Sequence, residues 1–435
     1  MTQNVLILGA AGKDFFVFQR LFKNNKEFTV KGFTATQIPG ISGRIFPREL
    51  AGRLYPKGIQ IYEEKNLEAL IKKLKIDLAV FAYSDVMHEH VMHLASRVNA
   101  SGAGFLLPGT KELMIESRKK VIAVTAVRTG SGKSPLTRRV VSLLKQAGKR
   151  VVVLRHPMPY GNLAKQAVQR FESKRDLVKH ECTIEEREEF EPLIEKGIVV
   201  YAGVDYEKIL KKAEKEAEVI VWDGGNNDIP FIKPDLWLCV ADPLRQGHEI
   251  SYYPGEINFR KADAIIISKV NSAKKSQIQK LVENARKLSP KARIIKTVSE
   301  IIAEHPEKIK NKKVLVIEDG PTLTHGNLAF GAGYILAKKM KAKIISPKPF
   351  AVGSIKQAFE KYPQIKKILP ALGYSRQQLK ELETTINKAK VDYVVIATPA
   401  RLNEFIEIKK PWIKVGYEIA EKGNALKKLL KEKGI

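Results

Sequence analysis

Residues 130–134 read Gly-Ser-Gly-Lys-Ser, the end of the phosphate-loop pattern G-x-x-x-x-G-K-[ST]. In such a loop, backbone N–H groups and a helix N-terminus surround phosphate oxygens, the lysine neutralises charge and the last hydroxyl ligates Mg²⁺. The apolar run KVIAVTA precedes the loop and the helix-length segment SPLTRRVVSLLKQAG follows it. The pattern predicts a site for ATP or GTP with Mg²⁺. Its expected nucleotide contacts are Thr129, Gly130, Ser131, Gly132, Lys133 and Ser134.

The loop departs from the pattern at its first position. Val127 stands where a glycine belongs, and Arg128 follows it. One branch of these proteins has the loop K-G-G-x-G-K-[ST], and Arg128 occupies its cationic first position. We predict that Arg128 reaches the γ-phosphate of its own nucleotide, or of one in a partner subunit, and stabilises transition-state charge. An outward salt bridge without a role in the reaction is the alternative.

A second apolar run ends in an acid that suits the metal. In EAEVIVWDGGNNDIPF, Asp223 closes an expected strand. A carboxylate beside the loop can hold Mg²⁺ through water, so Ser134 and Asp223 are the predicted metal ligands. Asn226 and Asn227 follow, where the γ-phosphate and the acceptor should meet.

The choice of base depends on the segment DAIIISKVNSA. Guanine-specific relatives carry [NT]-K-x-D after a strand, and here Lys269 and Asn271 occupy the lysine and aspartate positions. Lysine can still stack on a purine, but an amide makes only part of the hydrogen-bond pattern that guanine requires. This weakens GTP selectivity and makes ATP at least equally expected.

Other cations and polar groups follow expected strands, at the sheet edge where open α/β folds bind ligands. We predict that they hold a small anionic metabolite, with a structural or capping role as the alternative for each. They are Arg155, His156, Arg245, His248, Thr324 and His325. Catalytic roles are predicted for Lys133, Arg128, Asp223, Arg155 and His156.

Short β-branched apolar runs alternate with amphipathic segments along the whole chain, which predicts an α/β fold with mostly parallel sheets. The expected organisation is a Rossmann-like domain over residues 1–116 and a P-loop NTPase domain over 117–305. Residues 306–435 form either a C-terminal α/β domain or the completion of the P-loop sheet.

The first domain has only part of the dinucleotide fingerprint. Gly9 and Gly12 are present, but Ala11 and Asp14 occupy other positions of the pattern, and no acid ends the following strand. A Rossmann-shaped module with another task is favoured over a bound dinucleotide.

The composition bounds the partners. The 76 Lys and Arg against 47 Asp and Glu give a net charge of +29, which favours anionic partners. The basic residues are dispersed, so nucleic acid is not expected, and a Lys- and Glu-rich surface also suits life at high temperature. No apolar run has the length of a membrane span or a signal peptide, and two cysteines make no disulfide framework. We expect a cytoplasmic protein, and a homodimer by analogy with related loops.

Several segments together resemble a prokaryotic P-loop family of predicted GTPases and cyclic 2,3-diphosphoglycerate synthetase-like proteins. They include TAVRTGSGKS, VLRHPMPYG, VIVWDGGNNDIPF and VIEDGPTLTHG. The loop is also similar to that of dethiobiotin synthetases, in which ATP drives ligase chemistry. The resemblance implies an ATP-dependent ligase that closes an intramolecular phosphoanhydride in 2,3-diphosphoglycerate. A regulatory or metallochaperone GTPase is the alternative.

Overall fold

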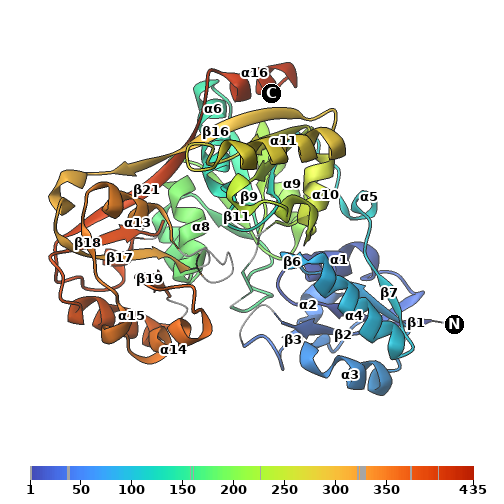
Figure 1. Ribbon diagram of the computed structural model, residues 1–435. Helices are drawn as coiled ribbons and strands as arrows, with labels where there is room; N and C mark the ends of the chain where they lie inside the picture. The colour runs from blue at the N-terminus through green and yellow to red at the C-terminus, as the bar shows by residue number, and fades with distance from the viewer. Residues whose placement is uncertain are drawn as a thin grey trace.

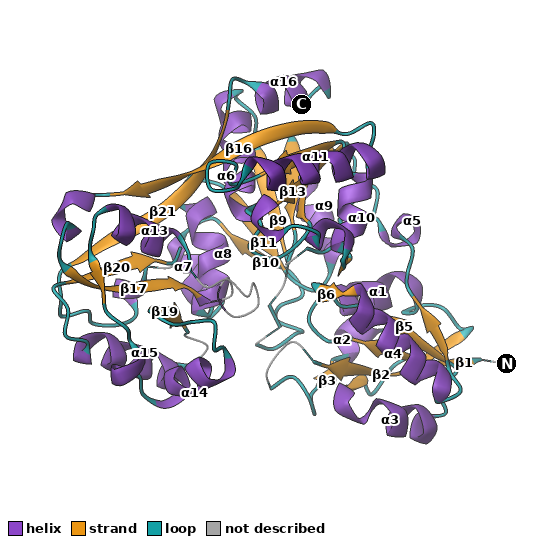
Figure 2. Ribbon diagram, viewed as in Figure 1, coloured by secondary structure: helices purple, strands orange, loops and turns teal. Residues whose placement is uncertain are grey.

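The structure, a computed structural model, describes almost the whole chain. The described residues are 2–36, 40–156, 158–159, 161–225, 227–320, 323, 330–372, 375–399 and 401–435. They form a six-stranded sheet, a 13-stranded sheet and a two-stranded ribbon, with helices between the strands (Figures 1 and 2). The predicted α/β class with mostly parallel sheets is confirmed. The boundaries proposed at residues 116 and 305 stay predictions.

The first sheet has the strand order β3-β4-β2-β1-β5-β7 and is parallel except for the β3–β4 pair. Its strands are β1 (Gln3–Leu8), β2 (Phe28–Ala35), β3 (Ile45–Phe46), β4 (Ile59–Glu63), β5 (Leu78–Phe81) and β7 (Gly104–Leu106). The accompanying helices are α1 (Lys13–Leu21), α2 (Arg48–Ala51), α3 (Leu67–Leu74), α4 (His88–Ala100) and α5 (Thr110–Leu113). We call this part the N-terminal unit; it is blue in Figure 1.

The large sheet contains the phosphate loop, in the order β10-β11-β9-β12-β8-β13-β15-β16-β21-β20-β17-β18, with β19 also paired to β17. Its first strands are β8 (Lys120–Ala126), β9 (Val151–Arg155), β10 (Gln169–Phe171), β11 (Val199–Ala202), β12 (Val219–Asp223), β13 (Leu236–Ala241) and β15 (Ala264–Ile267). The others are β16 (Arg293–Ala303), β17 (Lys313–Asp319), β18 (Lys343–Ile344), β19 (Ile368–Ala371), β20 (Tyr393–Ala397) and β21 (Trp412–Glu421).

Helices cover both faces of this sheet. Successive residues of β8 therefore pack alternately into two cores. Val121 and Ala123 pack with α9 residues in one core, and Ile122 and Val124 pack with α6 residues in the other. The helices are α6 (Lys133–Gln146), α7 (Lys174–Lys179), α8 (Ile184–Ile194), α9 (Tyr206–Glu216), α10 (Gly255–Lys261), α11 (Lys275–Leu288), α13 (Ala332–Lys339), α14 (Gly353–Lys361), α15 (Arg376–Lys388) and α16 (Ala425–Glu432). Short 3₁₀ helices are η1 (Glu64–Asn66), η2 (Pro243–Arg245), η3 (His248–Ile250), η4 (Pro306–Ile309), η5 (Lys348–Phe350) and η6 (Leu402–Glu404).

Two long antiparallel strands join the P-loop part of the sheet to the C-terminal part. Thr297 to Ala303 of β16 pairs with Val415 to Glu421 of β21, and β21 then pairs with β20. The C-terminal strands have a core of their own, whereas α16 returns to the P-loop core (Figure 1). Residues 306–435 therefore extend the large sheet and also bury a separate set of side chains. Among the described residues, no helix is long and apolar enough to cross a membrane.

The N-terminal unit is joined to the P-loop part by a ribbon and by an aromatic contact. The ribbon pairs β6 (Val86–Met87) with β14 (Tyr252–Tyr253). The rings of Phe16 and Phe231 stack with centroids 4.1 Å apart and planes 11° apart, and both are buried. This contact fixes the first turn of α1 against the segment that follows Asp223.

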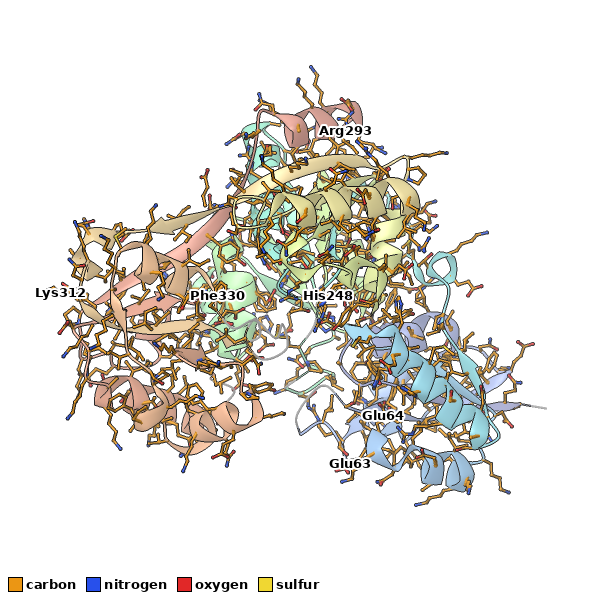
Figure 3. All side chains as sticks on the ribbon, in the orientation of Figure 1. Glu63, Glu64, His248, Arg293, Lys312 and Phe330 are labelled. Carbon is orange, nitrogen blue, oxygen red and sulfur yellow. The ribbon has the colours of Figure 1, made fainter. Side chains whose placement is uncertain are left out.

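Replacing Phe16 with alanine is expected to lower the free energy of unfolding by about 3–5 kcal/mol, because it removes a buried ring and leaves a cavity. Chemical denaturation followed by circular dichroism measures this. Phe330→Ala is the matched control, since Phe330 is 46% exposed (labelled in Figure 3), and it should have a much smaller effect. Equal losses in the two variants would contradict the role given to the Phe16–Phe231 contact.

Candidate active site around the phosphate loop

The phosphate loop has the backbone that its glycines allow. Gly130 and Gly132 have φ values of +81° and +111°, in the region that favours glycine. Lys133 is the first residue of α6, and its Nζ donates hydrogen bonds to the Asp223 carboxylate and the Gly224 carbonyl. The structure thus joins the predicted phosphate-binding lysine and the predicted metal ligand in an ion pair.

Asp223 is the buried centre of this arrangement. It ends β12 between β8 and β9, directly opposite Arg155 in the register of β9, and it forms ion pairs with Arg155 and Lys133. Burial raises the pKa of Asp223, but the charges of Arg155 and Lys133 outweigh it and hold the pKa below its usual value. Burial also lowers the pKa of Lys133 to about 8, against the attraction of Asp223.

The residues present fit a magnesium ion. The Ser134 hydroxyl and the Asp223 carboxylate are hard oxygen donors at the loop, and both border the space beside it. They would hold Mg²⁺ together with nucleotide phosphates, whose charge the ion would help to neutralise. Among the described residues, no group of three or more His, Cys, Asp or Glu side chains could hold a metal by itself.

The residues predicted to read the base contact protein groups. Lys269 Nζ donates to the Gly130 carbonyl (2.8 Å) and to Asp242 (2.5 Å), and so supports the loop. The amide of Asn271 exchanges two hydrogen bonds with the backbone of Ser299, at 3.0 and 3.1 Å. Base contacts by either residue stay a prediction.

Arg128 is turned toward the N-terminal unit. Its Nε donates to Asp85 Oδ1 at 3.0 Å, and its guanidinium lies 3.9 Å from the centre of the Tyr252 ring. His248 lies 3.4 Å from the same guanidinium. Burial, with the charges of Arg128 and Arg245, lowers the pKa of His248 to about 4, so this imidazole is neutral at neutral pH. Arg128 thus forms a buried ion pair with Asp85 of the N-terminal unit, and its predicted contact with the γ-phosphate stays a prediction.

Other predicted contacts lie against the loop itself. Arg245 donates to the Thr129 carbonyl, and Asn227 donates to the Val127 carbonyl at 3.0 Å. Both side chains are buried. Figure 3 shows His248 near the centre of the molecule, between the P-loop helices and the N-terminal unit. Asn226, Thr324 and His325 lie outside the described residues.

His156 is held in a narrow slot. A Cβ atom added to Gly12 would lie 2.4 Å from its Cε1, and one added to Gly225 would lie 2.5 Å from its Cγ. The Nδ1 atom of His156 lies 3.4 Å from a carboxylate oxygen of Asp228. Two glycines from different units therefore fix the imidazole beside Asp228.

A cavity of about 1370 Å³ opens from the loop and is bordered by all three parts of the chain. Lys133, Arg155 and His156 border it, as do Lys13 from the N-terminal unit and Lys414 from β21. Pockets for small ligands measure about 300–1,000 Å³ and often lie between structural units, so this cavity has room for a nucleotide and a second small molecule.

The sequence does not predict the side of this cavity that is formed by α8 and the C-terminal strands. Glu188 on α8 accepts a hydrogen bond from Thr398, and burial and the nearby Asp319 raise the pKa of Glu188 well above its usual value. Burial lowers the pKa of Lys414 to about 8, with Glu188 acting against it. One signal was available: Glu185, Glu188 and Glu189 have the i, i+3, i+4 spacing of one helix face.

The pKa of Lys133 predicts a pH dependence of nucleotide binding. Without nucleotide, Lys133 loses its proton above pH 8. Binding of ATP phosphates then requires that Lys133 first take up a proton. The Kd for ATP is therefore expected to rise about tenfold per pH unit above 8. Calorimetry between pH 7 and 10 measures it. In Lys133→Arg, whose guanidinium keeps its proton, the slope should vanish. A wild-type Kd that is constant from pH 8 to 10 would contradict this assignment.

The contact between Asp85 and Arg128 predicts a positioning effect. Asp85→Ala should lower the kcat for ATP turnover about tenfold or more, because the Arg128 guanidinium loses the carboxylate that orients it. The Kd for ATP should change little. In an Arg128→Ala background the same substitution should have almost no further effect. Steady-state kinetics measure both. Glu63→Ala is the matched control, because Glu63 is an exposed acid of the same unit, paired with Lys65. Additive losses from Asp85→Ala and Arg128→Ala would show that the two residues act independently.

Comparison with known proteins gives a near-complete match. Arginine synthetase ArcE of Thermococcus kodakarensis is 58% identical over 432 residues, which cover 99% of this chain and 96% of that protein. Cyclic 2,3-diphosphoglycerate synthetase of Thermococcus sibiricus is 27% identical over 128 residues, 29% of each chain. The crystal structure of LpxK from Aquifex aeolicus in complex with ATP covers 79% of this chain and 95% of its own, with 15% identity and a TM-score of 0.47. A likeness at this level carries no functional argument.

None of the protein-family models matches this chain. The predicted resemblance to cyclic 2,3-diphosphoglycerate synthetases is supported over a limited stretch, and no comparison supports the predicted GTPases. Because the 58% identity spans almost the whole of both proteins, this chain belongs to the family of arginine synthetase ArcE.

Proposed function

We propose that this chain is an ATP-dependent synthetase that forms arginine. The observation that carries the proposal is the 58% identity to arginine synthetase ArcE over 99% of the chain. The site is compatible with such a reaction, because Lys133, Asp223 and Ser134 can hold ATP and Mg²⁺ beside a cavity large enough for an amino acid.

Elementary chemistry indicates the acceptor. The guanidinium group of arginine differs from a ureido group by the replacement of one oxygen with nitrogen, so citrulline and ammonia are the simplest precursors. The ureido oxygen would attack the γ-phosphorus, forming an O–P bond while the bond to the β–γ bridging oxygen breaks and ADP leaves. Ammonia would then attack the ureido carbon; the C–O bond breaks, inorganic phosphate leaves and the nitrogen loses one proton.

The residues around the loop have matching roles in this proposal. Lys133 would neutralise the transferring phosphoryl group, and Arg128, oriented by Asp85, would stabilise charge that develops on the γ-phosphate. His156, fixed beside Asp228, would accept the proton of the attacking nitrogen, because an imidazole is a common general base in enzymes. Its place next to Gly225 puts it close to the lysine-bonded Gly224.

A second candidate is ATP-dependent formation of cyclic 2,3-diphosphoglycerate. The 27% identity to that synthetase over 128 residues favours it, as do the cations beside the loop. The relative with the wider and higher identity favours arginine, and we rank the candidates in that order. A homodimer stays a prediction in both cases.

The deciding experiment incubates the purified protein with ATP, Mg²⁺, citrulline and ¹⁵N-ammonium. We expect ¹⁵N-arginine, detected by mass spectrometry, in a one-to-one ratio with ADP, and no product from Lys133→Ala. A parallel reaction with 2,3-diphosphoglycerate is followed by phosphorus NMR. A cyclic product there, with no arginine in the first reaction, would replace the first candidate by the second. Strong activity with GTP and little with ATP would contradict the proposed nucleotide.

A further inference from the structure

The glycine turn of the N-terminal unit does not present a free phosphate cradle. Asp14 accepts hydrogen bonds from the backbone N–H groups of Ala11 (2.7 Å), Gly12 (3.0 Å) and Phe15 (2.8 Å). These are the groups that would surround a pyrophosphate in a dinucleotide-binding fold. The carboxylate of the chain itself fills that place, and so the turn has another task.

Lys13, next to this turn, is a buried cation at the wall of the cavity. It is 3% exposed, its Nζ lies 3.4 Å from Ser84 Oγ, and it faces the Tyr253 ring at 4.8 Å. Among the described residues, no carboxylate lies within 4.0 Å of this ammonium. Burial lowers the pKa of Lys13 to about 8, with Asp228 and Asp14 acting against it. A buried ammonium of this kind is stabilised by an anion brought by a ligand.

Asp228 supplies the opposite charge at the same wall. Its carboxylate accepts a hydrogen bond from Ser84, the hydroxyl that Lys13 also contacts. Burial raises the pKa of Asp228, but the contact with His156, the charge of Lys13 and the hydrogen bond from Ser84 outweigh it and hold the pKa below its usual value, so the group is ionised. One positive and one negative side chain thus border the cavity next to each other.

The contacts also order these groups relative to the phosphate loop. Lys133 bonds the Gly224 carbonyl, Gly225 lies against His156, and His156 contacts Asp228. Asp228 is joined through Ser84 to Lys13. In this series Lys13 is the group separated from Lys133 by the most contacts, which favours a role at the unreacting end of an acceptor.

We propose that Lys13 and Asp228 bind the α-carboxylate and the α-ammonium group of the acceptor amino acid, with Ser84 between them. This inference rests on the proposed arginine-forming function and assigns the specificity of the same site. The pair matches a zwitterion, because each charge of the ligand meets its opposite. A diphosphorylated acid suits it less well, because Asp228 and Asp14 would repel its charges. The N-terminal unit is then half of the acceptor site.

The test compares two acceptors in the same protein sample. Citrulline carries the α-carboxylate, and N-carbamoylputrescine is the same molecule without it. Wild type should use citrulline with the higher kcat/KM. In Lys13→Gln, kcat/KM for citrulline should fall about 10- to 100-fold, the loss expected for one buried hydrogen bond to a charged group. For N-carbamoylputrescine it should stay within about threefold, and the KM for ATP should not change.

The ratio of the two kcat/KM values is independent of the fraction of folded protein, so partial misfolding does not disguise the result. Lys13→Arg should restore part of the preference for citrulline. Lys26→Gln, which removes an exposed lysine of the same unit, is the matched control and should leave the ratio unchanged. If wild type forms arginine and Lys13→Gln keeps the full preference, the carboxylate assignment is wrong while the proposed function stands. If wild type forms no arginine, the function itself fails.

Discussion

The site depends on one buried carboxylate, that of Asp223, which lies between two cations. Parallel pairing places the ends of β8, β9 and β12 side by side, and this brings Lys133 and Arg155 to the same acid. A charge without solvent is stable only when it is paired, and here each partner needs the other. Arriving phosphates would compete with Asp223 for Lys133, and an Asp223 oxygen released in this way would become available to Mg²⁺. The pairing thus keeps the loop in shape while the substrate is absent.

Local patterns were sufficient to predict this part. The strand, loop and helix around Lys133 are contiguous, and Asp223 ends a run whose apolar residues already indicate a buried strand. The α/β class follows from the same alternation of runs. The contacts that the sequence did not predict join residues that are distant in sequence. Lys13 and Ser84 are 71 residues apart, Ser84 and Asp228 are 144 apart, and Glu188 and Thr398 are 210 apart. No spacing rule connects such pairs, because the packing of whole units brings them together.

The glycines of the N-terminal unit show that part of a dinucleotide-binding motif can serve a packing role. The sequence indicates that Gly9 and Gly12 are part of a Rossmann-like turn; in the structure Asp14 accepts hydrogen bonds from the backbone N–H groups of this turn. Gly12 is further required because any side chain there would collide with His156. The partial fingerprint is thus explained by contact with the P-loop unit, without a second nucleotide.

The net charge of the chain does not indicate the charges that border the cavity. The chain has a charge of +29, yet the cavity beside the loop is bordered by Glu188, Asp228 and Asp319 as well as by lysines and arginines. Many of the lysines are exposed on helices and loops, where water screens their charge. In the cavity, burial makes each charge depend on its immediate partner, as the shifted pKa values of Lys13, Lys133 and Glu188 show. A wall of mixed charge discriminates against a uniform polyanion and in favour of a ligand that carries both signs, which is the property an α-amino acid has and a diphosphorylated acid lacks.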